Sequence, residues 1–137
     1  MELRDVMTPD PTICRSDATA RDAATLMRDQ DIGDVLVQDD GGPLGIVTDR
    51  DIVTRAVAVG RDPAEVRLGE ICTPNVKSVA VDTPVDEVIR VMSDSAIRRI
   101  PVCEGDKPVG IVALGDLARD RDRSSLLGDI SAAPPNN

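Results

Sequence analysis

One short stretch of sequence occurs twice in the chain and organises the rest. It reads Gly45-Ile46-Val47-Thr48-Asp49-Arg50-Asp51-Ile52-Val53, and its second copy reads Gly110-Ile111-Val112-Ala113-Leu114-Gly115-Asp116-Leu117. Each copy predicts a buried strand that runs directly into a helix. Helix amides attract anions, and a carboxylate accepts hydrogen bonds from hydroxyl groups. The stretch therefore has the chemistry to bind a sugar and a phosphate.

The same residues also have a purely structural interpretation. Thr48 and Asp51 match a capping box, in which the Thr caps the helix and the Asp three residues later bonds back to it. In the second copy Ala113 cannot cap, yet Asp116 is retained. That Asp either compensates the helix dipole or binds a ligand, and the sequence leaves both interpretations open.

An internal duplication predicts the domain organisation. An offset of 65 residues aligns residues 6–55 with 71–120 without a gap, and 12 of the 50 pairs are identical, including Pro9/Pro74 and Gly45/Gly110. We predict a first motif at residues 1–60, a linker at 61–70, a second motif at 71–121 and a C-terminal tail at 122–137. One copy alone is too short to bury its sheet, so the two copies are expected to pack sheet against sheet.

Each copy is predicted to fold as β-α-β-β-α. The expected strands are residues 12–14, 34–38 and 44–47 in the first copy and 77–79, 99–103 and 109–112 in the second, with hairpin turns at 39–42 and 104–107. The first helices are expected to start at Ser16-Asp17 and, with Pro84 as the first helical residue, after Thr83. The second helices are expected from Asp49 to Val59, where Gly60 ends the helix, and from Leu114 to Arg121. Pro101 predicts that its strand is locally an edge.

Apolar residues at helical spacing predict the core-facing sides of the first helices. They are Ala20, Ala23, Ala24 and Met27 in the first copy and Val85, Val88, Ile89 and Met92 in the second. In the later helix of the first copy, Ile52, Val53, Ala56 and Val57 are either core residues or a patch for dimerisation. Cys14 and Cys72 occupy apolar positions and are expected to be buried thiols, whereas Cys103 aligns with Gln38 and is expected to be more exposed.

The composition excludes several classes of function. With 25 acidic and 16 basic residues the net charge is −9, which argues against binding duplex nucleic acid or an anionic membrane surface. Without aromatic residues, a purine base must lie between aliphatic side chains and backbone. Without His, histidine-based catalysis and the common zinc sites are excluded, and no metal site is predicted. The N-terminus lacks the apolar segment of a secretory signal, so a cytoplasmic location is expected.

The repeated motifs resemble a tandem pair of CBS domains, the family named after cystathionine β-synthase. The closest matches are Asp31-Ile32-Gly33-Asp34-Val35-Leu36-Val37, the Gly45 stretch, and Ile97-Arg98-Arg99-Ile100-Pro101-Val102. The resemblance covers roughly residues 3–121 and is strongest to small stand-alone CBS-pair proteins of bacteria. It implies an α+β fold of mixed layers, in which the two repeats are related by a pseudo-twofold axis.

The resemblance also implies a regulatory module that binds AMP, ADP, ATP or S-adenosylmethionine between the motifs, with no cofactor required. In that family the motif Asp holds the ribose and the Thr faces phosphate, which implies Thr48 and Asp51 for one site and Asp116 for the other. Thr12, Ile13 and Lys77 would offer backbone groups to adenine, and Val35, Ile46, Ile100 and Ile111 would form apolar walls. Arg98 and Arg99 stand where the family places basic residues toward phosphate, or else they form a solvated or dimer-facing strand start. We predict one competent and one degenerate site per chain.

Three functions are compared. The first is the nucleotide-responsive module, which signals to an unidentified protein partner and, as the family implies, forms a homodimer. The second is a ligand-free dimerisation or scaffold protein that keeps the fold. The third is an enzyme. The sequence argues against it, because it has neither a recognisable nucleophile–base pair nor a Gly-rich phosphate loop.

Overall fold

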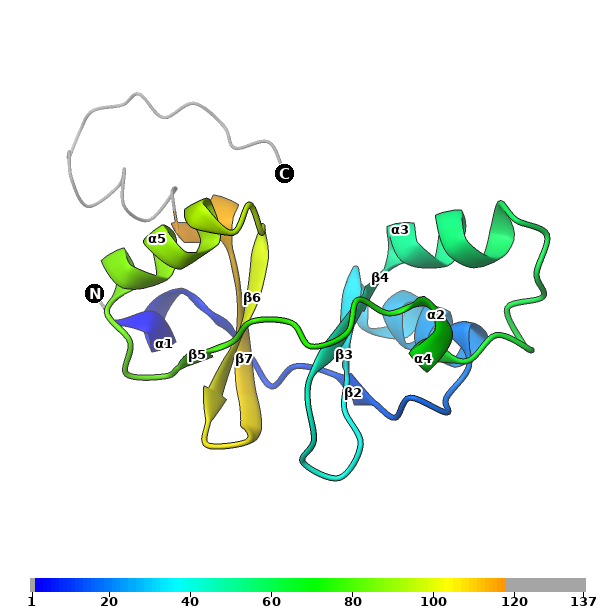
Figure 1. Ribbon diagram of the computed structural model, residues 1–137, viewed down its shortest axis with the longest axis horizontal. Helices are drawn as coiled ribbons and strands as arrows, with labels where there is room; N and C mark the ends of the chain where they lie inside the picture. The colour runs from blue at the N-terminus through cyan, green and yellow to red at the C-terminus, as the bar shows by residue number, and fades with distance from the viewer. Residues whose placement is uncertain (1, 118–137) are drawn as a thin grey trace. The chain divides into compact units, whose positions relative to one another are not determined.

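The two repeats fold into two sheets that belong to two compact units (Figure 1). The computed structural model describes residues 2–117. One unit, here called the continuous unit, is residues 11–76; the other, the split unit, combines residues 1–10 with the chain from residue 77 onward. The continuous unit is thus inserted, in sequence, between two parts of the split unit.

The continuous unit contains a three-stranded sheet in the order β2-β3-β4. Strands β2 and β3 are parallel and are joined by α2, while β3 and β4 form an antiparallel hairpin. Strand β4 then runs directly into α3 and a π-helical turn, η1. The bounds are β2 Ile13–Cys14, α2 Ala20–Gln30, β3 Asp34–Val37, β4 Gly45–Thr48, α3 Asp49–Ile52, η1 Val53–Val57 and α4 Leu68–Ile71.

The split unit repeats this pattern in a four-stranded sheet of order β1-β7-β6-β5. Strands β5 and β6 are parallel and joined by α5, β6 and β7 form the hairpin, and the N-terminal β1 pairs antiparallel with β7. The bounds are α1 Leu3–Val6, β1 Thr8–Pro9, β5 Val79–Ala80, α5 Val85–Asp94, β6 Arg99–Glu104 and β7 Lys107–Ala113, followed by helical residues 114–117. The predicted α+β class and the β-α-β-β-α order of each repeat are confirmed.

Each repeat begins with a short lead segment that packs in the unit of the other repeat. Lead segment 1 (residues 3–9, with α1 and β1) lies in the split unit, and lead segment 2 (residues 68–74, with α4) lies in the continuous unit. In the split unit β1 pairs with β7, and in the continuous unit Thr73 forms the corresponding bridge with Ile46. The compact units therefore do not follow the contiguous ranges 1–60 and 71–121 of the repeats, which remain a prediction.

The two motif glycines make room for the lead segments. A Cβ atom added to Gly45 would lie 3.1 Å from the Cys72 sulfur and 3.1 Å from the Thr73 carbonyl oxygen. A Cβ atom on Gly110 would lie only 2.4 Å from the sulfur of Met7, the repeat counterpart of Cys72. Both repeats retain Gly because a lead segment crosses directly over it.

Several predicted helix boundaries are wrong by a few residues. Helix α2 starts at Ala20 rather than near Ser16, because Thr19 is its N-cap and forms a capping box with Asp22. Pro84 is the N-cap of α5 rather than its first helical residue. The helical region that begins at α3 ends at Val57 rather than at Val59, and Gly60, with φ +81°, lies in the turn that follows. The predicted end at Arg121 and the tail at 122–137 lie outside the described residues.

The predicted core positions are confirmed on both first helices. The continuous unit buries Ala20, Ala23 and Met27 from α2, and the split unit buries Val88 and Met92 from α5, with the other predicted members packed against these cores. Pro101 lies on an inner strand, but β5 begins only opposite Val102, so β6 is locally an edge at Pro101.

The prediction for Cys103 is wrong. Its side chain is only 7% exposed because it lies on β6, which β5 and β7 flank on either side. Cys14 is also buried, and Cys72 is partly exposed. No helix within residues 2–117 is both long and apolar enough to cross a membrane.

Candidate functional site

Thr48 and Asp51 form a capping box at the junction of β4 and α3. The Asp51 amide donates to the Thr48 hydroxyl at 3.1 Å, and the Thr48 amide donates to Asp51 Oδ2 at 2.9 Å. The Asp51 side chain is 17% exposed. The structure therefore shows the capping box, and it leaves part of the Asp51 side chain exposed. A carboxylate can accept further hydrogen bonds from hydroxyl groups.

Arg55 lies beside the second oxygen of Asp51. Its Nε is 3.9 Å from Asp51 Oδ1, and its Nη1 donates to the Ile71 carbonyl oxygen at 2.9 Å. Ile71 is the last residue of α4, so Arg55 links the helix that carries Asp51 to lead segment 2. The site therefore combines a carboxylate, a hydroxyl and a guanidinium within one unit.

Lead segment 2 packs next to Thr48 and Asp51. Its Thr73 forms two backbone hydrogen bonds, at 2.9 and 3.0 Å, with Ile46, which lies two residues before Thr48 on β4. The Cys72 thiol is near enough to Asp51 and Arg55 for both charges to act on it. Its pKa is raised, mainly by burial and in addition by the Asp51 charge, while Arg55 acts in the opposite direction. Cys72 is thus a neutral thiol next to the candidate site.

The split unit has the same junction with different residues. Ala113 ends β7 and residues 114–117 are helical, so Asp116 takes the place of Asp51 without a capping hydroxyl at position 113. The Leu114 amide donates to the Arg98 carbonyl oxygen at 2.8 Å, and Arg99 pairs with Ala113. In the continuous unit Gly33 and Asp34 hold these positions.

The predicted basic residues therefore share a unit with Asp116 rather than with Asp51. Arg98 and Arg99 are exposed at the start of β6. Thr48 and Asp51 lie in the continuous unit. Each unit therefore has its own set of polar groups at this junction: a hydroxyl and a carboxylate in the continuous unit, and a carboxylate and two guanidinium groups in the split unit.

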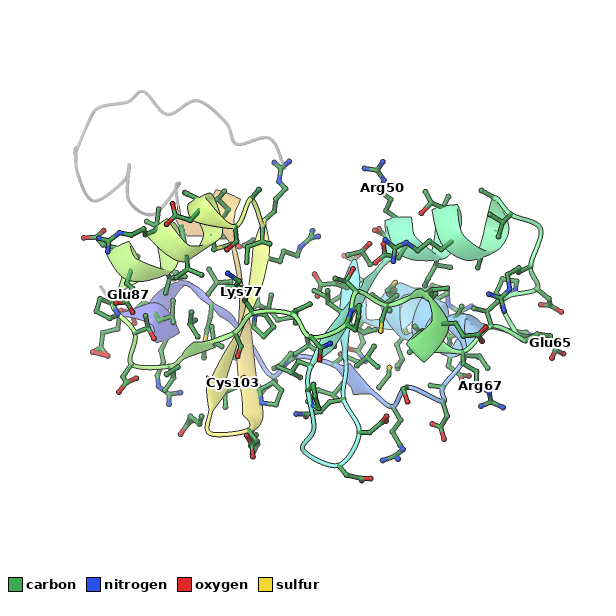
Figure 2. All side chains as sticks on the ribbon, viewed as in Figure 1. Arg50, Glu65, Arg67, Lys77, Glu87 and Cys103 are labelled. Carbon is green, nitrogen blue, oxygen red and sulfur yellow. The ribbon has the colours of Figure 1, made fainter. Side chains whose placement is uncertain are left out.

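The predicted adenine-contacting residues lie on the first strands of the units or just before them. The Thr12 carbonyl oxygen already accepts from the Leu36 amide at 2.9 Å, and Ile13 is exposed. The Lys77 side chain, visible in Figure 2, donates to the Ser95 hydroxyl at 2.9 Å. The Thr12 carbonyl and the Lys77 ammonium group are therefore already used in hydrogen bonds within the protein.

The predicted apolar walls divide into two pairs. Val35 and Ile100 have no exposed surface and belong to the cores of their units. Ile46 and Ile111 lie on the partly exposed face of β4 and β7. Only the second pair presents surface to a ligand in the structure.

Sequence reasoning missed Arg55 and the role of Cys72. Arg55 follows Asp51 at the helical spacing i, i+4, which is a recognisable ion-pair signal. The position of Cys72 depends on lead segment 2 folding back onto the first repeat, which no local pattern indicates. Among residues 2–117 there is no group of three or more His, Cys, Asp or Glu side chains able to hold a metal ion.

Comparison with known proteins identifies the two repeats. The family model for the CBS domain matches residues 3–58 and 68–122. The chain is 38% identical over 136 residues to the uncharacterized protein YlbB of Bacillus subtilis, covering 95% of this chain and 91% of that protein. It is 33% identical over 130 residues to hypoxic response protein 1 of Mycobacterium tuberculosis, covering 94% and 91%.

Solved structures give the same result. A hexameric CBS-CP12 protein from bloom-forming cyanobacteria matches with a TM-score of 0.80 and 31% identity over 90% of this chain and 70% of that one. Hypoxic response protein I, crystallised with two coordinated zinc ions, matches with 0.74 and 35% over 87% and 98%. A CBS domain pair in complex with 5′-methylthioadenosine and S-adenosyl-L-methionine matches with 0.76 and 29% over 91% and 98%.

These matches span both repeats and nearly the full length of the small bacterial relatives, so the resemblance predicted from the sequence is confirmed. Proteins built from such pairs are generally regulatory rather than catalytic. The chain belongs to the CBS domain family and carries two CBS domains in tandem.

Proposed function

We propose that this protein is a regulatory module that binds an adenosine compound and transmits its presence to a protein partner. The observation that carries the proposal is the Thr48–Asp51 group, in which a partly exposed carboxylate is held in place by the backbone next to a hydroxyl group. A related CBS pair was crystallised with S-adenosyl-L-methionine and 5′-methylthioadenosine, which supports an adenosine ligand here.

In this proposal Asp51 accepts hydrogen bonds from the ribose and Thr48 faces the phosphate or its equivalent. In the continuous unit Ile46 packs against the base, and the backbone near Thr12 and Ile13 contacts its edge. In the split unit Ile111, Lys77, Arg98, Arg99 and Asp116 belong to the corresponding site. Because only the continuous unit has the hydroxyl at the helix start, we propose one competent and one degenerate site per chain, and expect one tight stoichiometric binding event.

A thermal-shift screen with AMP, ADP, ATP and S-adenosylmethionine tests the proposal. A ligand at 100 times its dissociation constant stabilises the folded state by about 2.7 kcal/mol. Asp51→Ala should abolish the shift. Asp49→Ala is the matched control, because Asp49 is exposed on the same helix and its side chain accepts only from the next amide, that of Arg50. Two equal, independent sites by titration calorimetry would contradict the one-site proposal.

Cys72 supplies a second measurement without any label. It is the partly exposed thiol among the three cysteines, and it lies beside Asp51 and Arg55. A ligand seated on Asp51 should slow alkylation of Cys72 by iodoacetamide, and should do so in wild type but not in Asp51→Ala. Unchanged alkylation at saturating ligand would place the ligand elsewhere.

A ligand-free scaffold is the second candidate, and exposed valines favour it. Val53 and Val57 are each 55% exposed and lie four residues apart on η1, while the residue before each of them, Ile52 and Ala56, is buried. We propose that this valine face mediates homodimerisation, as self-association occurs in related CBS proteins such as the hexamer. Val57→Asp should shift the sedimentation coefficient toward the monomer, whereas Ala58→Asp, at an exposed neighbouring position, should not.

The proposed module is not an enzyme, requires no cofactor and works in the cytoplasm. If no adenosine compound shifts the melting temperature and Val57→Asp still dissociates the protein, the scaffold function replaces the regulatory one.

A further inference from the structure

We propose that Arg55 is a positioning residue that holds Asp51 in the orientation needed for ligand binding. This inference rests on the proposed function, since it gives Arg55 a role in the same site. Arg55 need not touch the ligand itself. It acts through the Asp51 carboxylate and through lead segment 2.

The contacts around Asp51 assign one neighbour to each carboxylate oxygen. Oδ2 accepts from the Thr48 amide at 2.9 Å, which fixes the carboxylate on the side of β4. Oδ1 faces Arg55 Nε at 3.9 Å, close enough for attraction but too long for a hydrogen bond. The charge of Arg55 therefore acts on the rotation of the carboxylate without its Nε forming a hydrogen bond to Oδ1.

Arg55 is itself held at the other end. Its Nη1 donates to the carbonyl oxygen of Ile71 at 2.9 Å, where α4 ends. The next two residues are Cys72 and Thr73, and Thr73 is paired with Ile46 on β4. The guanidinium thus completes a closed ring of contacts that runs from Asp51 through Arg55, lead segment 2 and β4 back to Thr48.

The arginine in this ring distinguishes the first repeat from the second in sequence. At the offset of 65 residues, the counterpart of Arg55 is Asp120, a residue of opposite charge. Asp116 therefore has no arginine four residues after it. Arg55 thus lies beside the capped Asp51 of the site that we propose to be competent.

Replacing Arg55 should change the orientation of the Asp51 carboxylate more than the free energy of unfolding. Arg55 is 51% exposed, and exposed ion pairs contribute little to folding. Its fork geometry matters more, because Lys cannot reach a carbonyl and a carboxylate at once. We therefore expect Arg55→Lys to restore only part of what Arg55→Ala loses.

Hydrogen exchange of the Thr48 amide tests the positioning role in the ligand-free protein. That amide is bonded to Asp51 Oδ2, so its exchange reports the carboxylate orientation. Arg55→Ala should raise its exchange rate about threefold, the size expected for an exposed charge contact. In an Asp51→Ala background, Arg55→Ala should add nothing. Arg61→Ala is the matched control, because Arg61 pairs with Glu70 on α4 at 2.7 Å without contacting Asp51.

Ligand affinity supplies the second measurement. Uncharged adenosine and AMP should both bind Arg55→Ala more weakly by the same factor, since both use Asp51. A loss confined to AMP would show a direct phosphate contact and overturn the positioning role. Equal Thr48 exchange in Arg55→Ala and Arg61→Ala, or additive effects with Asp51→Ala, would overturn it as well. If wild type binds neither compound, the proposed function fails, while the exchange result still decides the role of Arg55.

Discussion

The two units share a fold but differ at the junction between strand and helix. In the continuous unit Thr48 caps α3, Asp51 bonds back to it, and Arg55 lies alongside. In the split unit Ala113 stands in place of the Thr, while Arg98 and Arg99 lie next to the same junction. The duplication has kept the core and the lead segments and changed the polar groups at the junction. The fold therefore does not require the cap, so the cap residues can be changed to separate folding stability from ligand binding.

The lead segments give the largest expected effects, because each buries a leucine in the unit of the other repeat. Leu3 and Leu68 are repeat counterparts, and both are buried in their cores. Leu→Ala at such positions costs about 2–5 kcal/mol. Leu3→Ala should destabilise the split unit, and Leu68→Ala the continuous unit.

Hydrogen exchange resolved by residue separates these two outcomes. In Leu3→Ala, amides of β6 and β7 should lose protection while those of β3 and β4 keep theirs, and Leu68→Ala should show the reverse. Loss of protection in residues 11–60 on Leu3→Ala would contradict the assignment of lead segment 1 to the split unit.

The motif glycines should respond differently to an added methyl group. At Gly110 the added Cβ meets the flexible Met7 side chain, whereas at Gly45 it meets the backbone oxygen of Thr73 as well as Cys72. Overpacking of this kind costs about 1–3 kcal/mol. Thermal denaturation should show that Met7→Ala relieves Gly110→Ala. Cys72→Ala should not relieve Gly45→Ala, because the Thr73 oxygen remains; a full rescue would show that the sulfur alone is responsible.

Much of the fold could be predicted because its signals are local or repeated. The alternating strands, the apolar faces of α2 and α5, and the hairpins at Asp40-Gly41 and Gly105 depend on neighbouring residues. The exchange of lead segments could not be predicted, because it depends on which sheet edge a short strand pairs with. Cys103 was misjudged because β6 continues through it to Glu104, whereas β3 ends at Val37, one residue before the partly exposed repeat counterpart Gln38.

The candidate site could be predicted only as far as its motif. The Thr48–Asp51 spacing indicates both a cap and a ligand contact, and the structure shows the cap. Val35 and Ile100 were assigned to ligand walls by resemblance, but β3 and β6 are buried at consecutive positions, and neither side chain has exposed surface. The link from Arg55 to Ile71 joins segments 16 residues apart through a side chain and a carbonyl group, which spacing does not reveal.

The cap residues of the two junctions can be exchanged between the units. Thr48→Ala should destabilise the continuous unit by about 1 kcal/mol, the usual value of an N-cap. Ala113→Thr should stabilise the split unit by a similar amount, because its hydroxyl can accept from the Asp116 amide. Denaturant titration, followed by amide hydrogen exchange in each unit, measures both changes in stability. Ala113→Ser is the control, because Ser is a smaller capping residue. A destabilised Ala113→Thr would mean that the split-unit junction has no room for a hydroxyl.

Low pH should lower the folding stability of the continuous unit, by less than the cap substitutions do. The Ser16 hydroxyl and amide donate to Asp39, which holds the pKa of that carboxyl below its ordinary value. Donation from Thr19 lowers the pKa of Asp22, and Arg61 together with the Arg67 amide lowers that of Glu70. All three lie in the continuous unit. A carboxyl with a depressed folded pKa contributes stability above its unfolded pKa and loses it as the pH falls through the folded pKa.

We therefore expect the melting temperature of the continuous unit to fall from pH 6 to pH 3, and to fall less in Asp39→Asn. The Asn side chain can still accept from Ser16 but cannot titrate, so the variant removes the pH dependence while keeping one hydrogen bond. Asp10→Asn removes a charge from the split unit and should leave the slope in the continuous unit unchanged. If Asp39→Asn and wild type lose equal stability over this range, the bonds from Ser16 make no net contribution, and the acid sensitivity must come from Asp22 and Glu70.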